Sequence, residues 1–154
     1  MPRSSFALIA AAAILVAACS TGGGAATAPA GSSAASSVGG ATRVEVKLTD
    51  SLRIEPAAIT VPAGVPVTFV ITNSGGTDHE FYLGDEAAQA EHGKEMVASG
   101  GMVHDEPEGI AVKPGQTREL TYTFAQPGQT LAGCHVAGHY GAGMKAAITI
   151  TVTG

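Results

Sequence analysis

Near its carboxyl end the chain contains the stretch GCHVAGHYGAGMKAAITITVT, residues 133–153. The second half of this stretch alternates between apolar Ile148, Ile150 and Val152 and polar Thr residues, which is the two-residue period of a strand with one buried face. The same alternation occurs in three earlier segments, residues 43–49, 67–72 and 119–124. Strands of this kind bury their apolar faces by packing sheet against sheet. The sequence therefore predicts an all-β sandwich of about seven short strands.

One segment inside the predicted sandwich has a different composition. Residues 84–109 contain seven acidic residues and a single base, Lys94. Residues 85–98 favour a helix, with Asp85 capping its amino end, although Gly93 weakens this prediction. We therefore expect a short helix and a glycine-rich loop, inserted between strands.

The amino-terminal residues 1–18 resemble a secretion signal. Arg3 precedes an unbroken apolar run over residues 6–18, which is too short to cross a bilayer as a helix. The run ends in Val-Ala-Ala-Cys, with Cys19 last, and this is similar to the lipobox at which bacterial lipoproteins are cleaved and lipidated. Ordinary cleavage, which would leave Cys19 without lipid, is the alternative.

The residues after Cys19 predict the domain organisation. Residues 20–42 consist of Ala, Gly, Ser, Thr and Pro with a single Val, a composition that favours a flexible linker. We therefore expect a signal peptide over 1–18, a lipidated Cys and linker over 19–42, and a folded domain over 43–154. The protein is then an exported, membrane-anchored lipoprotein of the cell envelope that faces the periplasm or the extracellular side.

The composition excludes several classes of function. The chain has 154 residues and a formal net charge of −5, whereas a nucleic-acid-binding protein needs a basic face for the phosphates. Its two Cys are too few for a disulfide-rich scaffold. If Cys19 carries lipid, Cys134 is the only thiol left in an exported protein, and such a thiol calls for a specific role.

Cys134 begins a regular series of potential metal ligands. His139 and Met144 follow it at five-residue steps, just before the last predicted strand. A thiolate, an imidazole and a thioether suit copper in both of its oxidation states. A trigonal site needs a second imidazole. His79 is the best candidate, because it follows a strand and a turn whose loop a sandwich can bring next to Cys134.

With these residues the chain resembles the cupredoxins, the blue type 1 copper proteins that include plastocyanin and azurin. The resemblance implies a Greek-key β-sandwich over nearly all of the folded part. It implies one type 1 copper per chain, with His79, Cys134 and His139 as equatorial ligands and Met144 as the weak axial ligand. It further implies outer-sphere electron transfer and no enzymatic activity.

Two positions depart from the small electron carriers of that family. Glu80 follows the upstream His, where those carriers often have an Asn that connects the two ligand loops. His135 follows Cys134 directly, as in the multicopper oxidases, where this His leads to a trinuclear copper cluster. The chain has five His in all, too few for such a cluster. We therefore expect His135 to be exposed or to make a local hydrogen bond, with a role as an electron exit as the alternative.

We expect the protein to exchange electrons with a redox partner, either a cytochrome or a copper enzyme. The resemblance implies His139 as the exit, and the uncharged residues around it fit a docking surface. The acidic insertion is expected to attract a basic partner. The alternative function is that of a copper-binding or copper-tolerance lipoprotein, which captures or buffers copper.

The insertion also contains spare metal ligands. His92 and Met96 lie four residues apart and share a face of the predicted helix, and Met102 and His104 follow in the loop. In one interpretation these four residues form a second, weak copper site. In the other, Met96 packs the helix on the sandwich while the His and acidic residues are solvated.

Overall fold

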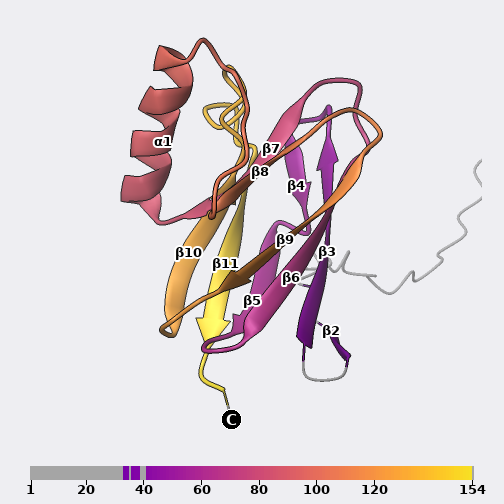
Figure 1. The fold of residues 1–154 in the computed structure, drawn as a ribbon, viewed down its shortest axis with the longest axis vertical. Helices are drawn as coiled ribbons and strands as arrows, with labels where there is room; N and C mark the ends of the chain where they lie inside the picture. The colour runs from indigo at the N-terminus through magenta and orange to yellow at the C-terminus, as the bar shows by residue number, and fades with distance from the viewer. Residues whose placement is uncertain (1–32, 35, 39–40, 154) are drawn as a thin grey trace, which may run out of the picture.

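The computed structural model describes residues 33–34, 36–38 and 41–153, and it confirms the predicted β-sandwich (Figure 1). These residues form eleven strands and one helix. In chain order the elements are β1 (Ser33–Ala34), β2 (Ser36–Val38), β3 (Ala41–Thr49), β4 (Arg53–Glu55), β5 (Ala58–Pro62), β6 (Pro66–Asn73), β7 (His79–Gly84), α1 (Glu86–Ala98), β8 (Gly109–Val112), β9 (Thr117–Thr123), β10 (Gly128–Gly133) and β11 (Lys145–Thr151). No helix in the described part of the chain is both long and apolar enough to cross a membrane.

The strands form two sheets. One contains β1, β5, β11, β10, β7 and β8 in this order, and the other contains β2, β3, β6 and β9, with β4 also paired to β3. β6 and β7 are consecutive in the chain but belong to different sheets, so the connection between them, residues 74–78, passes from one layer to the other. This crossing determines the position of the first residue of β7.

The core lies between the two sheets and follows the predicted alternation. The apolar positions of β3, Val44, Val46 and Leu48, are all buried. Phe69 of β6 packs against Phe81 of β7 across the sandwich, with their ring centroids 5.2 Å apart. The two layers are therefore joined by aromatic contact close to the start of β7.

The last predicted strand ends earlier than its alternation suggests. β11 pairs with β5 only as far as Thr151, and Val152 beyond it is 73% exposed. Because Val152 has no place in the strand ladder, its apolar character does not bring it into the core. The prediction that Val152 continues the buried face is therefore wrong.

Strands also occur within residues 19–42, where the composition favours a flexible linker. β1 pairs with β5 in parallel, and β2 pairs with β3 antiparallel. Small polar residues join a sheet edge in this way because the ladder hydrogen bonds use backbone atoms alone. The predicted signal segment, residues 1–18, and the predicted lipidation at Cys19 lie outside the described residues.

The helix in the insertion is confirmed. Asp85 caps α1 by accepting a hydrogen bond from the backbone N–H of Ala88 at 2.8 Å. Figure 1 shows α1 against the outside of the sandwich, beside β7, β8 and the β10–β11 connection. Gly93 explains the close fit, since a Cβ at this position would lie 3.1 Å from Nδ1 of His135 in that connection.

Candidate metal centre

The candidate centre forms where the start of β7 meets the end of β10. These strands are antiparallel neighbours, with Tyr82 opposite Gly133. His79 is the first residue of β7, and Cys134 directly follows β10. The register therefore brings the predicted upstream His beside the predicted Cys, 55 positions away in the sequence.

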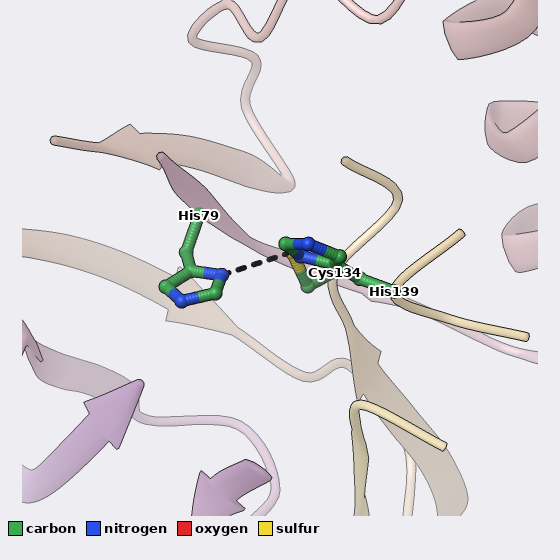
Figure 2. A group of neighbouring side chains, drawn as sticks. All are labelled: His79, Cys134 and His139. Carbon is green, nitrogen blue, oxygen red and sulfur yellow. Dashed lines mark hydrogen bonds between the residues drawn. The ribbon is translucent and has the colours of Figure 1, made fainter. Parts of the chain in front are cut away.

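His79 is fully buried, and its ring points toward Cys134. Its Nδ1 lies 3.8 Å from Sγ of Cys134, as Figure 2 shows. Burial, helped by the neighbouring His139, lowers the pKa of His79 below its ordinary value. The ring is therefore neutral at pH 7, and Nδ1 has a lone pair for a metal.

Asp50 holds the loop that leads to His79. Its carboxylate accepts hydrogen bonds from the backbone N–H of Gly76 at 2.7 Å and from the hydroxyl of Thr77 at 3.0 Å. Its Oδ1 also faces Nε2 of His79 at 3.7 Å, and this Nε2 has no hydrogen-bond partner among the described residues. Gly75 is required here, because a Cβ at this position would collide with the Asp50 carboxylate. Asp50 thus positions His79 from the side opposite to Cys134.

Cys134 is the buried end of the centre. Its side chain has no exposed surface, and burial raises the pKa of its thiol to about 12. The Sγ accepts a hydrogen bond from the backbone N–H of Glu80 at 3.4 Å. A thiol so far from its charged form is not a free nucleophile at neutral pH. Its burial beside two imidazoles instead suits a metal ligand.

The third candidate ligand, His139, comes from the β10–β11 connection, which folds back on itself. The backbone N–H of Met144 donates to the carbonyl of His139 at 3.0 Å, and that of Cys134 donates to the carbonyl of Met144 at 3.2 Å. Gly138 and Gly143 have positive φ angles of 83° and 94°, which turn the loop at little steric cost. Nδ1 of His139 then lies 3.5 Å from Sγ of Cys134.

The separations between these atoms fit a metal ion. Bonds of about 2.0 Å to nitrogen and 2.3 Å to sulfur that meet at about 120° place the two ligand atoms about 3.7 Å apart. The observed Sγ–Nδ1 separations are 3.8 Å for His79 and 3.5 Å for His139. Met144, the fourth predicted ligand, is fully buried in the same apolar core as Cys134. The structure therefore brings the predicted trigonal set together, and the backbone of Met144 hydrogen-bonds both His139 and Cys134.

Glu80 connects the two ligand segments, a role that sequence reasoning missed. Its side chain is buried, and its Oε1 accepts a hydrogen bond from the backbone N–H of His135 at 2.5 Å. The same carboxylate lies 3.2 Å from Nε2 of His92 in α1. The departure from the Asn of the small electron carriers thus preserves the link between the loops, and it adds a link to the helix.

His135 makes a local hydrogen bond, which is one of the roles predicted for it. Its Nε2 lies 2.7 Å from Oε1 of the buried Gln89, and its ring stacks on Tyr140 with centroids 4.3 Å apart. Burial, together with the nearby His92, lowers the pKa of His135 to about 4. His135 is therefore a neutral ring that joins the β10–β11 connection to α1.

The four spare ligands of the insertion do not share one environment. His92 and Met96 are buried, whereas Met102 is 69% exposed and His104 is exposed. The ligand atoms close to Nδ1 of His92 belong to two carboxylates, those of Glu95 and Glu106. The burial of Met96 agrees with helix packing, but the burial of His92 disagrees with a solvated His.

Comparison with known proteins shows the family of the chain. A family model described as a cupredoxin-like domain matches residues 8–134. "Copper-resistant cuproprotein CopI" of Rubrivivax gelatinosus is 36% identical over 107 residues, which cover 70% of this chain and 65% of that protein. The protein of the same name from Pseudomonas aeruginosa is 36% identical over 136 residues, with 70% of this chain and 75% of that protein covered. The chain thus spans just under two thirds of the Rubrivivax protein.

Two solved structures share the fold. Reduced auracyanin from Roseiflexus castenholzii is 22% identical with a TM-score of 0.64, covering 71% of this chain and 96% of its own. Auracyanin A, a "blue" copper protein from Chloroflexus aurantiacus, is 24% identical with a TM-score of 0.63, and the match covers 73% of this chain and 100% of that protein. At these identities the two likenesses bear on the fold alone.

Proposed function

Because the chain belongs to the family of cupredoxin-like domains, we propose that it holds one copper ion as a type 1 centre and transfers single electrons. His79, Cys134 and His139 are the equatorial ligands in this proposal, and Met144 is the weak axial ligand. The observation that supports it most is the convergence of two Nδ1 atoms on one buried Sγ, at 3.8 and 3.5 Å. When bound, copper supplies a one-electron couple between Cu(I) and Cu(II).

The surrounding residues restrain the ligands in one geometry. Asp50 and the β6–β7 loop fix His79, while Glu80 hydrogen-bonds both Cys134 and the backbone of His135. Side chains and backbone held in this way move little between oxidation states, so little reorganisation opposes each electron transfer. Burial of Cys134 also keeps water away from its sulfur.

His139 is the proposed point of electron exit. It is partly exposed, whereas His79 and Cys134 have no exposed surface. Its neighbours Ala137, Gly138 and Ala142 are exposed and uncharged, so a partner can approach this ring without desolvating charged groups. The partner we propose is a basic cytochrome or copper enzyme, attracted by the acidic insertion. The protein acts as a carrier and not as an enzyme in this proposal.

The colour of the oxidised protein tests the centre. The Cu(II)-loaded wild type should absorb strongly in the visible through sulfur-to-copper charge transfer and show a narrow copper hyperfine splitting. Cys134→Ser should lose both signals, whereas His104→Ala, outside the centre, should keep them. A coloured Cys134→Ser protein would contradict the proposed ligand set.

Copper tolerance is the second candidate function, supported by the name of the CopI relatives. In this case metal capture is the role, and deleting the gene should make the cell sensitive to copper. Growth of a deletion strain on copper separates the two. Rescue of growth by Cys134→Ser would favour capture at other residues, whereas loss of rescue would tie tolerance to the Cys134 centre.

The cell envelope is the proposed location. The apolar run over residues 6–18 and the lipobox-like sequence at Cys19 support export and lipid anchoring on either the periplasmic or the extracellular side.

A further inference from the structure

His92 is a buried histidine held in a single orientation. Its side chain is 3% exposed, and its ring stacks on Tyr82 with centroids 3.8 Å apart and planes within 2° of each other. Its Nε2 lies 3.2 and 3.3 Å from the two carboxylate oxygens of Glu80. With its proton donated from Nε2 to this carboxylate, the ring offers Nδ1 as the nitrogen that can bind a metal.

That Nδ1 faces two further carboxylates. It has no hydrogen-bond partner among the described residues, and it lies 3.8 Å from Oε2 of Glu95 and 3.8 Å from Oε2 of Glu106. The three atoms lie within 4.8 Å of one another. A buried and unpartnered nitrogen aimed between two acidic groups is unfavourable by itself, and a cation between the three atoms would satisfy all of them.

The fold builds this arrangement from two separate segments. His92 and Glu95 lie three residues apart on α1 and so share one face of the helix. Glu106 returns in the loop before β8, where it exchanges backbone hydrogen bonds with Gly109 at 2.8 and 3.2 Å. Its other oxygen, Oε1, lies 2.6 Å from Nε2 of His104. One Glu106 oxygen is thus held by His104, and the other faces His92.

We propose that His92, Glu95 and Glu106 form a second metal site, for a divalent transition-metal cation such as Zn²⁺ or Cu²⁺. One imidazole and two carboxylates are the ligand set of such ions, whereas Cu⁺ prefers sulfur. The site goes beyond the proposed electron-transfer function and does not depend on the Cys134 centre. It also differs from a thioether site, since its ligand atoms are one imidazole nitrogen and two carboxylate oxygens that lie within 4.8 Å of one another, and Met102 is exposed to solvent.

The geometry allows the ligands to close on an ion. Metal bonds of about 2.0–2.2 Å at tetrahedral angles separate ligand atoms by about 3.4 Å, slightly less than the distances around Nδ1. The Glu95 side chain is 61% exposed and that of Glu106 is 23% exposed, so both carboxylates have room to move toward the rigid ring. His92 is thus the fixed ligand and the two carboxylates are the adjustable ones.

The test is a Zn²⁺ titration of the full protein after it has been loaded with one equivalent of copper. Calorimetry and elemental analysis should find one additional Zn²⁺ per chain. Glu95→Gln and Glu106→Gln should each weaken its binding by about tenfold or more. Glu91→Gln is the matched control, because Glu91 lies on the same helix but pairs with Lys94 at 2.8 Å, and it should bind Zn²⁺ as the wild type does.

Two further measurements separate this site from the copper centre. The same titration of Cys134→Ser should again find the Zn²⁺ site. Adding Glu106→Gln to Cys134→Ser should weaken Zn²⁺ binding as much as it does in the wild type, whatever happens at the copper centre. A second equivalent of Cu²⁺ should give a signal with wide hyperfine splitting and little colour. Three results would each overturn the proposal. They are no Zn²⁺ binding at all, equal Zn²⁺ binding in the wild type and both Glu variants, and loss of Zn²⁺ binding with Met102→Ala instead of with the Glu variants.

Discussion

Glu80 donates its backbone N–H to Sγ of Cys134 at 3.4 Å, and its own buried carboxylate accepts the backbone N–H of His135, the next residue along, at 2.5 Å. One residue of β7 is therefore hydrogen-bonded to the side chain of Cys134 and to the backbone of His135. Because the carboxylate also holds Nε2 of His92, it joins the sandwich, the ligand loop and α1 at one point.

Replacing Glu80 should therefore destabilise the protein. Glu80→Ala leaves the His135 N–H and the His92 Nε2 buried without their acceptor, and each such group costs about 1–3 kcal/mol. We expect the free energy of unfolding in urea to fall by about 2 kcal/mol or more in Glu80→Ala, and by a smaller amount in Glu80→Gln. Glu45→Ala, at an exposed position of β3, is the control, and an equal loss in both variants would remove the role assigned to Glu80.

Asp50 should give the protein a characteristic acid sensitivity. The hydrogen bond from Gly76, followed by that from Thr77, holds the pKa of Asp50 below its ordinary value of 3.8. A depressed folded-state pKa means that the ionised carboxylate stabilises the fold above pH 3.8, and that this stabilisation disappears as the pH falls through the lower folded value. Asp50→Asn should have a lower free energy of unfolding than the wild type at pH 7, and this difference should shrink toward pH 3. If the difference stays the same at all pH values, the charge of Asp50 does not cause the stabilisation.

Copper loading should release a proton from Cys134. The thiol has its pKa raised to about 12 by burial, whereas burial lowers the pKa of His79, so at pH 7–8 the thiol is protonated and His79 is not. Ligation requires the thiolate, so binding should release about one proton per copper and strengthen about tenfold per pH unit over this range. Calorimetry in buffers of different ionisation enthalpy measures this number. A value near zero would mean that Cys134 does not ligate as a thiolate.

The acidic insertion should steer basic redox partners. Changing the exposed Glu86 and Glu91 to Gln should slow electron transfer to a basic cytochrome c at low salt, because it removes negative charge from α1. The difference should shrink as the Debye length falls from about 30 Å at 0.01 M to about 3 Å at 1 M salt. Stopped-flow absorbance measures the rate. The pair Glu45→Gln and Glu55→Gln makes the same charge change on β3 and β4 and should have a smaller effect.

Lipidation at Cys19 should anchor the protein to a membrane. The wild type should partition with the membrane fraction, because two or more acyl chains are needed for stable anchoring and a bacterial lipoprotein carries them. Cys19→Ala should be released or remain unprocessed, while Cys134→Ala should stay membrane-bound. Fractionation and mass spectrometry of the amino-terminal peptide check this, and soluble wild-type protein would contradict lipidation.

The parts of the structure that sequence predicted well depend on local patterns. The alternation of Val44, Val46 and Leu48 predicts a buried strand face, and the five-residue steps from Cys134 to Met144 predict ligands of one loop. These signals need no knowledge of distant residues. His79 needed more than a local pattern: its place after a strand and a turn made it the best candidate for the second imidazole, and the family resemblance then implied the same role.

The parts that sequence missed depend on contacts between distant segments. Glu80 is recognisable as a departure from a family pattern, but its bond to His135 needs the pairing of β7 with β10. The carboxylate of Glu106 reaches His92 only because the loop after α1 returns to β8. Spacing on the helix points to Met96 as the neighbour of His92, and the structure also places carboxylate oxygens of Glu95 and Glu106 near Nδ1 of His92.

The backbone hydrogen bonds within the ligand loop have a consequence for the life of the protein. The bonds from Met144 to His139 and from Cys134 to Met144 join main-chain atoms only, and metal ligation would use none of those atoms. The shape of the loop is therefore encoded in the polypeptide and does not wait for an ion. If the chain holds copper as proposed, folding and metal acquisition are separate events in time, and the supply of copper, rather than the rate of folding, then determines when a newly made molecule becomes active.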